Sequence, residues 1–597
     1  MKELLYIDGQ LVDLGEGVNI TLNYKSNMLT DLSKIVGNNS YTINLPKTMK
    51  NLNIIGCADM AGVVSSFPRT YHEARYFRNG VELFKDGKAV LMGVGDTIEI
   101  VLLWGLSSGV YKLVELDKNL NEFTGVDDYV MWEAINSKSA FDGRTKVVNM
   151  DVQYGLKSGE TLAAIHPSVR SSYIFDLIES NFGVSFDLPH ERKGLVNSLM
   201  IPLLTRNGGF ANSYRSLGGV SYSTLTGNYV INKLGDDFDL NFERIAPSYS
   251  DSTHFIAFRA LVSGKLKIRP TFQSFKSDIA VYFGDGTNKN EWDKEYLSYH
   301  FENNDNIVND VYIYDTPIEI DLMEGQSFGI DLLQTIQMGL NDSYFQFEIG
   351  KSEVEIGDRF PIVENLPNIS CVEYVKAIAA IGGMFCVPSD DGAIKFITFE
   401  SLADRSNAVD WTEKLIVKDA TNKPRSISYS LNDFARKNNM LWADDDSVGI
   451  TTANGAILVD DVTLDLERDA VELPFAASDT RGGKAMIRLY EYDDDGKPEL
   501  QSVEPRILIE KDMDGYSTGT FDGLHWNTII GEYYNTYQNA VKSPVVVSEL
   551  VRLDELSLRD LDVAKPVYLR QYGRYYAIVE VKAPSSGVCE CKLLQLD

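Results

Sequence analysis

The chain has 597 residues, of which 44% are hydrophobic and 11% are aromatic. At roughly 150 residues per domain this length favours about four domains, and the composition excludes a disordered chain. The formal net charge of −30 disfavours direct binding to nucleic acid or anionic lipid, because such a surface repels phosphate groups. The charge suits a soluble protein, or a lumen through which DNA slides without sticking.

The cysteines and the apolar runs bound the compartment. The cysteine number is odd and the spacing irregular, which disfavours a disulfide framework. Residues 1–9 lack a long apolar core, so we expect no signal peptide, and no run of about 18 apolar residues predicts a membrane span. We expect a protein made in the cytoplasm. The cysteines are Cys57, Cys371, Cys386, Cys589 and Cys591; we expect the last two to be packed thiols on one face of a strand rather than metal ligands.

The first 115 residues predict β-structure. Alternating apolar residues in 41–45 indicate a strand that Pro46 ends. Further on, 81–85 and 89–92 flank the pair Asp86-Gly87. Because Asp-Gly accepts positive φ, this pattern predicts a hairpin with its turn at Asp86-Gly87.

A helix, a glycine and a strand follow one another at two places in the chain. The first predicted helix has Pro167 in its first turn and ends at Gly183. The second begins with the capping-box pair Ser370 and Glu373 and ends at Gly382. These two units predict two related half-domains.

Between the two units, residues 236–356 predict an inserted β-sandwich of the jelly-roll kind. Strand candidates come at short intervals there, and no helical pattern interrupts them. Trp292, Tyr296 and Tyr299 lie close together in the sequence. They could stack on a sugar ring of a host surface glycan, or they could pack the sandwich.

No spacing in the sequence indicates catalysis, so we expect no enzyme, no cofactor and no metal site. The chain lacks an HExxH pair, a GxSxG turn and a Walker A loop. A glycoside hydrolase stays an alternative, because acidic residues are abundant and two carboxylates suffice for that reaction. The six histidines, which we expect to be ordinary core or surface residues, are His72, His166, His190, His254, His300 and His525.

Two acidic loops raise a calcium alternative. Residues 285–293 and Asp493–Gly496 are rich in oxygen-bearing side chains, which calcium prefers. Neither loop has the EF-hand spacing. Hairpin turns rich in Asp, Asn and Gly are the commoner explanation, so calcium stays open.

Six short segments together resemble the large tail proteins encoded by phages and prophages of Bacteroides-type bacteria. They are spread over most of the chain but are absent from 236–356, and their order and combination carry the resemblance. The segments are Ser40–Thr48 with Asn51 beyond it, Arg78–Phe84, His166–Arg170, Ile201–Thr205, Asp410–Lys414 and Pro566–Leu569.

The resemblance implies a non-catalytic structural protein of the virion, a tail hub or baseplate component. By analogy with related hubs, it implies two β-barrel domains per chain that resemble tail-tube subunits and form a trimeric ring. Its partners would be the tail tube and other tail proteins, without sequence-specific binding of nucleic acid. A receptor-binding tail protein with a glycan-binding insert and a tail-associated hydrolase remain the alternatives.

The expected fold class is therefore mainly β with a few short helices (α+β), built from tail-tube-like barrels and an inserted sandwich. We expect five domains along the chain. They are an N-terminal β domain at 1–115, a first hub half-domain at 116–235, the inserted sandwich at 236–356, a second hub half-domain at 357–480 and a C-terminal β domain at 481–597.

Overall fold

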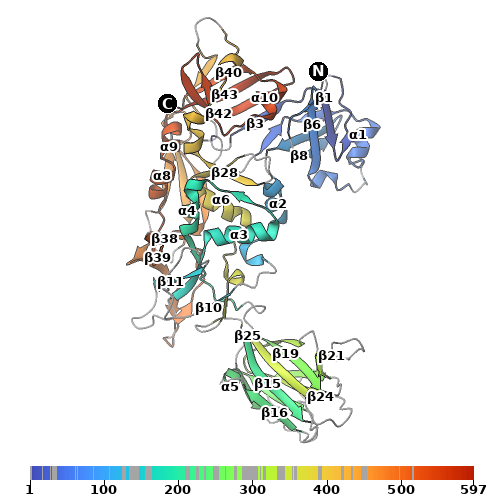
Figure 1. Cartoon of the computed structure of the whole chain (residues 1–597), viewed down its shortest axis with the longest axis vertical. Coiled ribbons are helices and arrows are strands. Elements are labelled where there is room, and N and C mark those ends of the chain that lie inside the picture. The colour runs from blue at the N-terminus through green and yellow to red at the C-terminus, as the bar shows by residue number, and fades with distance from the viewer. Residues whose placement is uncertain are drawn as a thin grey trace. The chain divides into compact units, whose positions relative to one another are not determined.

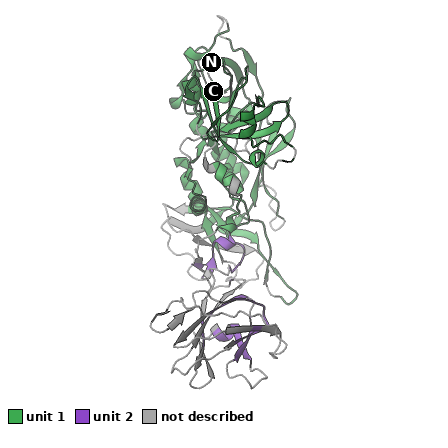
Figure 2. Ribbon diagram, turned by 90° about the vertical axis from the view of Figure 1, so that its right-hand side faces the viewer, with its two compact units in different colours: residues 1–124, 138–202, 367–597 green, residues 125–137, 203–366 purple. Residues whose placement is uncertain are grey.

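The chain forms two compact units in a computed structural model (Figures 1 and 2). Unit 1 comprises Met1–Thr124, Lys138–Pro202 and Pro367–Asp597, and unit 2 comprises Gly125–Ser137 and Leu203–Leu366. The structure describes residues 3–16, 18–26, 29, 37–60, 62, 65–84, 86–105, 108–123, 129–132, 147–154, 165–208, 215–223, 228–233, 237–245, 255–261, 264–273, 279–285, 307–308, 311–313, 318–332, 343–351, 354, 359–387, 393–418, 423–431, 434–445, 453–496, 498–513 and 516–596.

The largest sheet of unit 1 joins strands from the two ends of the sequence. Its strands are β1 (Glu3–Ile7), β2 (Gln10–Leu11), β3 (Leu22–Lys25), β4 (Asn38–Ser40), β5 (Ile43–Leu45), β6 (His72–Arg78), β7 (Val81–Glu82), β8 (Gly87–Val94), β9 (Ile98–Trp104), β29 (Val409–Asp410), β30 (Ser426–Ser428), β40 (Val546–Arg552), β41 (Val567–Leu569), β42 (Arg574–Ala583) and β43 (Val588–Leu596). The order is β2-β1-β6-β8-β9-β4-β3-β42-β43-β40-β30, with β5, β7, β29 and β41 paired to it from the side. Among the described residues this path has two open ends, β2 and β30.

The pairing of β3 with β42 connects the N-terminal and C-terminal parts of this sheet (Figure 1). Leu22 lies opposite Ala583, and Tyr24 lies opposite Val581. All four side chains are buried in one core. The segments expected as separate domains at 1–115 and 481–597 therefore share a sheet and a core, which differs from the predicted domain map.

The tight turn in the N-terminal part lies at Asn79-Gly80 and not at Asp86-Gly87. Arg78 pairs with Val81 across it, so β6 and β7 form a hairpin with a two-residue loop. Asn79 and Gly80 have φ values of 49° and 85°, as a type I′ turn requires. The hairpin predicted at Asp86-Gly87 is wrong, because β7 pairs with β6 and not with β8.

Both predicted helix–glycine–strand units form. Helix α3 (Ser171–Phe182) ends at Gly183, whose φ of 60° is left-handed, and α6 (Cys371–Ile381) begins with the predicted capping box. The strands β13 (Phe186–Asp187) and β27 (Met384–Val387) flank β28 (Ile394–Thr398) in one small sheet. The placement of Pro167 was wrong, because it lies in β12 (Ile165–Arg170) and not in the first turn of α3.

Helices α3 and α6 pack against each other. The Tyr374 hydroxyl donates to Ser171 Oγ at 2.7 Å, and the rings of Phe175 and Tyr374 lie 6.0 Å apart. All three residues are buried. The two units thus share one core, and their relation as duplicated half-domains stays a prediction.

The rest of unit 1 consists of smaller sheets and short helices. One sheet contains β34 (Thr480–Arg481), β35 (Lys484–Arg488), β11 (Val147–Tyr154), β12, β14 (Leu199–Pro202), β38 (Leu508–Met513) and β39 (Tyr516–Asp522), another contains β32 (Gly455–Leu458), β31 (Lys437–Ala443) and β33 (Glu467–Ala476), and β36 (Tyr490–Tyr492) pairs with β37 (Pro498–Leu500). The other helices are α1 (Met49–Ile54), α2 (Ser108–Leu116), α4 (His190–Ser198), α7 (Phe399–Leu402), α8 (Trp526–Tyr533), α9 (Asn535–Lys542) and α10 (Glu555–Arg559).

Unit 2 contains two antiparallel sheets that face each other across a phenylalanine core. One sheet has β16 (Asn228–Lys233), β15 (Arg215–Ser223), β25 (Ser343–Lys351), β19 (Gly264–Gln273), β22 (Val311–Ile313), β21 (Ile307–Val308) and β23 (Ile318–Leu322), and the other has β17 (Phe242–Ile245), β18 (Phe255–Ala260), β24 (Gln326–Leu332) and β20 (Ile279–Asp285). Phe347 of the first sheet packs on Phe258 and Phe328 of the second, with ring centroids 5.7 and 6.0 Å apart. This is the packing expected of a β-sandwich.

The predicted boundary at residue 236 cuts through this arrangement. Strands β15 and β16 precede residue 236, yet β15 is hydrogen-bonded to β25 along its length. Unit 2 accordingly begins at Leu203 and also includes β10 (Tyr129–Met131), which pairs with β26 (Arg359–Pro361). The mainly β fold class is confirmed, whereas the tail-tube-like barrels remain a prediction.

Candidate functional site

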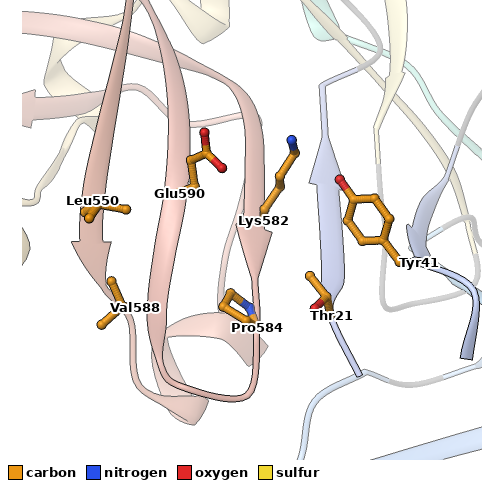
Figure 3. Close-up of a pocket in the computed structure, with 7 residues that line it drawn as sticks. All are labelled: Thr21, Tyr41, Leu550, Lys582, Pro584, Val588 and Glu590. Carbon is orange, nitrogen blue, oxygen red and sulfur yellow. The ribbon is translucent and has the colours of Figure 1, made fainter. Parts of the chain in front are cut away.

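An open pocket lies on one face of the sheet where the two ends of the sequence meet (Figure 3). Its volume is about 500 Å³, and it spans β3, β42, β43 and β40. Lys582 lies opposite Glu590, and Glu590 lies opposite Leu550. Directly opposed residues share a face of a sheet, so these three side chains form a row along the pocket. The full lining is Thr21, Tyr41, Leu550, Lys582, Pro584, Val588 and Glu590.

The charges beside the pocket compensate one another. Glu580 lies 3.0 Å from Lys592 Nζ and 4.0 Å from Lys582 Nζ. Burial alone would raise the pKa of Glu580, but the hydrogen bond and charge of Lys592 outweigh it, so the pKa is lowered. Burial alone would lower the pKa of Lys582, but Glu580 and the Tyr41 hydroxyl outweigh it and the pKa is raised. Both groups are therefore held in their charged forms.

The chemistry of the pocket is that of binding. It offers an ammonium group, two hydroxyl groups and the apolar surface of Leu550, Pro584 and Val588. Glycoside hydrolysis needs two carboxyl groups about the scissile bond, and Glu590 is the single carboxylate among the seven lining residues. The lining thus suits contact with a polar and apolar surface of a partner.

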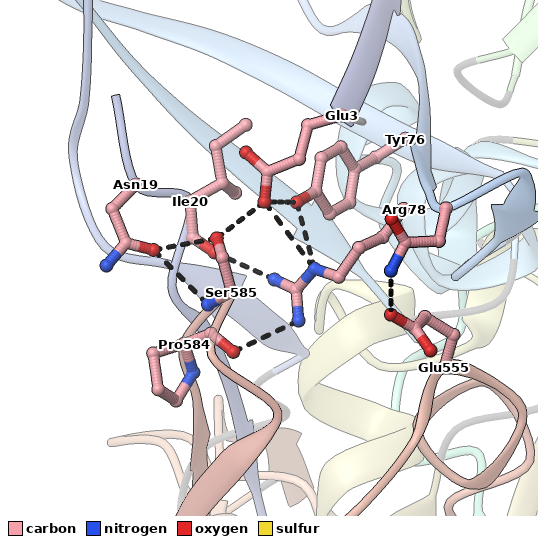
Figure 4. Close-up of polar contacts among 9 residues, drawn as sticks. Glu3, Asn19, Ile20, Tyr76, Arg78, Glu555, Pro584 and Ser585 are labelled. Atoms are coloured by element: carbon pink, nitrogen blue, oxygen red, sulfur yellow. Dashed lines mark hydrogen bonds and ion pairs between the residues drawn. The ribbon is translucent and has the colours of Figure 1, made fainter. Parts of the chain in front are cut away.

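A buried network around Arg78 fastens this sheet together (Figure 4). The Arg78 guanidinium donates to the carbonyl oxygens of Ile20 at 2.9 Å and Pro584 at 3.2 Å. It also donates to the Tyr76 hydroxyl, which in turn donates to Glu3 at 2.8 Å. Arg78 is 1% exposed. We call these contacts the Arg78 network.

The Arg78 network is extended by two contacts to the C-terminal part of the chain. Ser585 Oγ donates to Asn19 Oδ1 at 2.7 Å, and Asn79 Nδ2 donates to Glu555 of α10 at 2.6 Å. These bonds join residues that are 566 and 476 positions apart. Such pairing cannot be read from local sequence patterns, and sequence reasoning missed it.

His72 lies in a Thr–His–Asp arrangement that the sequence did not reveal. Its Nδ1 is 2.7 Å from Asp8, and its Nε2 is 3.0 Å from Thr70 Oγ1. Nε2 is also 3.0 Å from the carbonyl oxygen of Phe67. A carbonyl oxygen only accepts, so Nε2 carries the proton and cannot take one from Thr70, as nucleophilic catalysis would require. The arrangement therefore fixes the local chain.

The other described histidines also make structural contacts. His166 Nε2 is 3.0 Å from the hydroxyl of Tyr490 in a buried site, and His525 Nε2 is 2.7 Å from Asp479. His190 begins helix α4. His254 and His300 lie outside the described residues.

All five cysteines are free thiols. Cys371, Cys386, Cys589 and Cys591 are buried, and Cys57 is partly exposed. Burial raises the pKa of Cys371 and Cys386 to about 12 and that of Cys589 to about 11. The predicted packing of Cys589 and Cys591 in a strand is confirmed, because both lie buried in β43.

The calcium and sugar alternatives gain no support from the structure. Asp493–Gly496 forms the exposed turn between β36 and β37, as expected of a hairpin. In the part of the chain that the structure describes, no three His, Cys, Asp or Glu side chains are arranged to hold a metal ion. Asp285 ends β20, while residues 286–293 lie outside the described residues. Trp292, Tyr296 and Tyr299 lie there as well, so glycan binding stays a prediction.

Comparison with protein-family models and with curated proteins gives no match. The fold alone therefore defines the class, a mainly β protein of two compact units. None of the described helices combines the length and apolar character needed to cross a bilayer.

Proposed function

We propose that this chain is a structural protein of a bacteriophage tail. It would act as a distal hub or baseplate component that forms a trimeric ring on the tail tube. DNA would pass through the ring, and receptor-binding parts would attach to it. The tail-tube-like barrels implied by the sequence resemblance are part of this proposal.

The proposal is carried by the way in which the resembling segments pair. Asp410–Lys414 begins at the end of β29, which pairs with β41 of the segment Pro566–Leu569. In the same way, β12 of His166–Arg170 pairs with β14, where Ile201–Thr205 begins. Segments that are distant in sequence but adjacent in space belong to one architecture. The resemblance therefore concerns a shared fold rather than scattered short matches.

Two further observations support a structural role. The strongly acidic surface suits a channel that DNA crosses without binding, because it repels phosphate groups. The pocket chemistry and the buried His72 cluster suit binding and stability rather than bond cleavage. Residues 236–356 carry none of the resembling segments, so unit 2 is the part expected to differ between such proteins.

Immunogold electron microscopy of particles tests the proposal. Antibodies raised against the purified chain should label one end of the tail in phage or induced prophage particles that encode it. Mass spectrometry of the same particles should detect the chain in a fixed ratio to the tube protein. Labelled cells with unlabelled, chain-free particles would overturn the proposal.

A further inference from the structure

One end of the large sheet carries exposed apolar side chains. We call the group of Ile427, Tyr429, Val462 and Leu466 the β30 patch. Their side chains are 46%, 69%, 84% and 74% exposed. Monomeric proteins seldom gather large apolar side chains in one exposed place, and such patches mark interaction surfaces.

The β30 patch is held together by contacts between two segments. Ser430, next to Tyr429, makes a side-chain hydrogen bond with Asp461, next to Val462. Leu466 is fixed by its carbonyl oxygen, which accepts from the Lys437 amide at 3.1 Å. The patch therefore has a defined position beside β30.

The strand at this patch has an open edge. In the pairings of the described strands, β30 bonds to β40 and to no second strand. An open edge presents unpaired backbone donors and acceptors to another chain. Apolar side chains next to such an edge make it a place for docking rather than a blunted edge.

The charge beside this edge is opposite to that of the chain. Residues 414–430 contain four basic residues and one acidic residue, whereas the whole chain carries −30. Lys418 and Lys423 are exposed, and neither forms an ion pair with a described residue. The electrostatic complement of this edge is an acidic surface.

The opposite end of the same sheet has such a surface. Residues 3–16 contain four acidic residues and no basic one. Asp8 and Asp13 are 45% and 40% exposed although they contact His72 and Lys50, and Glu16 is exposed. Strand β2, the other open end of the sheet, lies within this segment.

We propose that copies of this chain associate head to tail, with the β30 patch and edge of one copy docked on the β1–β2 end of the next copy. Charge complementarity favours this occupant over another acidic protein, and it sets the orientation. A head-to-tail contact forms a closed ring when the rotation between copies closes. This inference rests on the proposed function for the number of copies, but it assigns the interface by itself.

Crosslinking between isotopically distinct copies tests the interface directly. Full-length chain is prepared with natural and with ¹⁵N-enriched nitrogen, mixed, and treated with a zero-length carbodiimide. Mixed-label crosslinks should join Lys418 or Lys423 to Asp8, Asp13 or Glu16. Oligomers whose mixed-label crosslinks lie elsewhere would overturn this interface and leave the proposed function standing.

Substitutions then test the two forces separately by sedimentation velocity. The change Tyr429→Asp should weaken self-association by about tenfold or more, and Met323→Asp is the matched control because Met323 of unit 2 is 74% exposed. The pair Lys418→Glu and Lys423→Glu should weaken association, and adding Glu16→Lys should restore part of it. Equal effects of Tyr429→Asp and Met323→Asp, or no restoration, would overturn the interface. A chain that stays monomeric at every concentration would overturn both the interface and the ring.

Discussion

Arg78 is buried in strand β6, and its guanidinium serves three carbonyl or hydroxyl acceptors. The change Arg78→Met keeps the aliphatic length but leaves these acceptors and Glu3 unpaired. We expect it to lower the free energy of unfolding by about 3 kcal/mol, because an unpaired buried group keeps its desolvation cost. Urea unfolding followed by tryptophan fluorescence measures this.

The control for this change lies in the same strand. Arg75 pairs with Glu82 at 2.7 Å, but its side chain is half exposed. Water screens such a pair, so Arg75→Met should cost less than about 1 kcal/mol. If the two changes cost the same, the Arg78 network does not hold the sheet as described.

The thiols give a second prediction for single residues. Four of the five are buried, and burial raises the pKa of three of them to about 11 or 12. A thiol that stays protonated and covered reacts slowly with disulfide reagents. At pH 8 the native protein should react rapidly at Cys57 alone, and the denatured protein at all five cysteines. Rapid reaction of a second native thiol would contradict the described core.

Sequence reasoning identified these residues unevenly. The burial of Cys589 and Cys591 follows from their spacing in a strand, which is a local property. The partners of Arg78 and His72 do not, because Pro584 and Asp8 lie far from them in the sequence. A buried arginine has no periodic pattern of its own, so only the fold reveals the Arg78 network.

The two glycines that follow α3 and α6 offer a matched test of a helix end. Gly183 and Gly383 have φ values of 60° and 58°. A Cβ at Gly183 would meet nothing within 4 Å, whereas a Cβ at Gly383 would lie 2.6 Å from the carbonyl oxygen of Tyr533. Gly183→Ala should therefore cost about 1 kcal/mol for left-handed backbone alone.

Gly383→Ala carries the same backbone cost and adds a clash with the backbone of α8. We expect it to cost at least about 2 kcal/mol more than Gly183→Ala, as overpacking does. Thermal unfolding of the two variants in parallel gives the difference. Equal melting temperatures would show that α8 shifts freely away from α6.

The elements predicted best were those with a local signal. The capping box of Ser370 and Glu373 sets the start of α6, and its glycines set the end, as expected. The hairpin was misplaced because Asp86-Gly87 and Asn79-Gly80 both suit positive φ, and pairing of β7 with β6 decides between them. Pro167 was misplaced because a proline is accepted at a helix start and also in a strand.

Unit 2 gives a prediction for a whole folding unit. A fragment of residues 215–351 contains the strands of both facing sheets and should unfold cooperatively. The fragment 236–356 lacks β15, whose Leu217 and Val220 are buried, and it exposes the edge of β25. We expect it to be markedly less stable or insoluble, as measured by circular dichroism during heating.

An internal control shows that the core described here is responsible. In the 215–351 fragment, Phe347→Ala should lower the free energy of unfolding by about 3–5 kcal/mol, because it empties the centre of the phenylalanine cluster. Met323→Ala, at an exposed position, should leave stability nearly unchanged. A 236–356 fragment as stable as 215–351 would restore the boundary that the sequence suggested.

The sandwich strands were predictable because each has a run of apolar and aromatic residues. Where the unit begins was not, since β15 and β16 follow Gly-rich sequence that resembles the preceding segment. The sheet shared by the two ends of the chain was also beyond local reasoning. Strand pairing over such distances depends on the whole molecule, whereas turns and caps depend on a few neighbours.

The pairing of β3 with β42 has a consequence for synthesis. A ribosome releases β3 and β4 long before β42 is translated, so the edge of β3 that β42 covers stays open during most of elongation. Unit 2 lies between them in the sequence and can fold while the earlier strands wait. Unit 1 therefore closes only after translation ends, and its yield should depend on chaperones that protect the waiting strand.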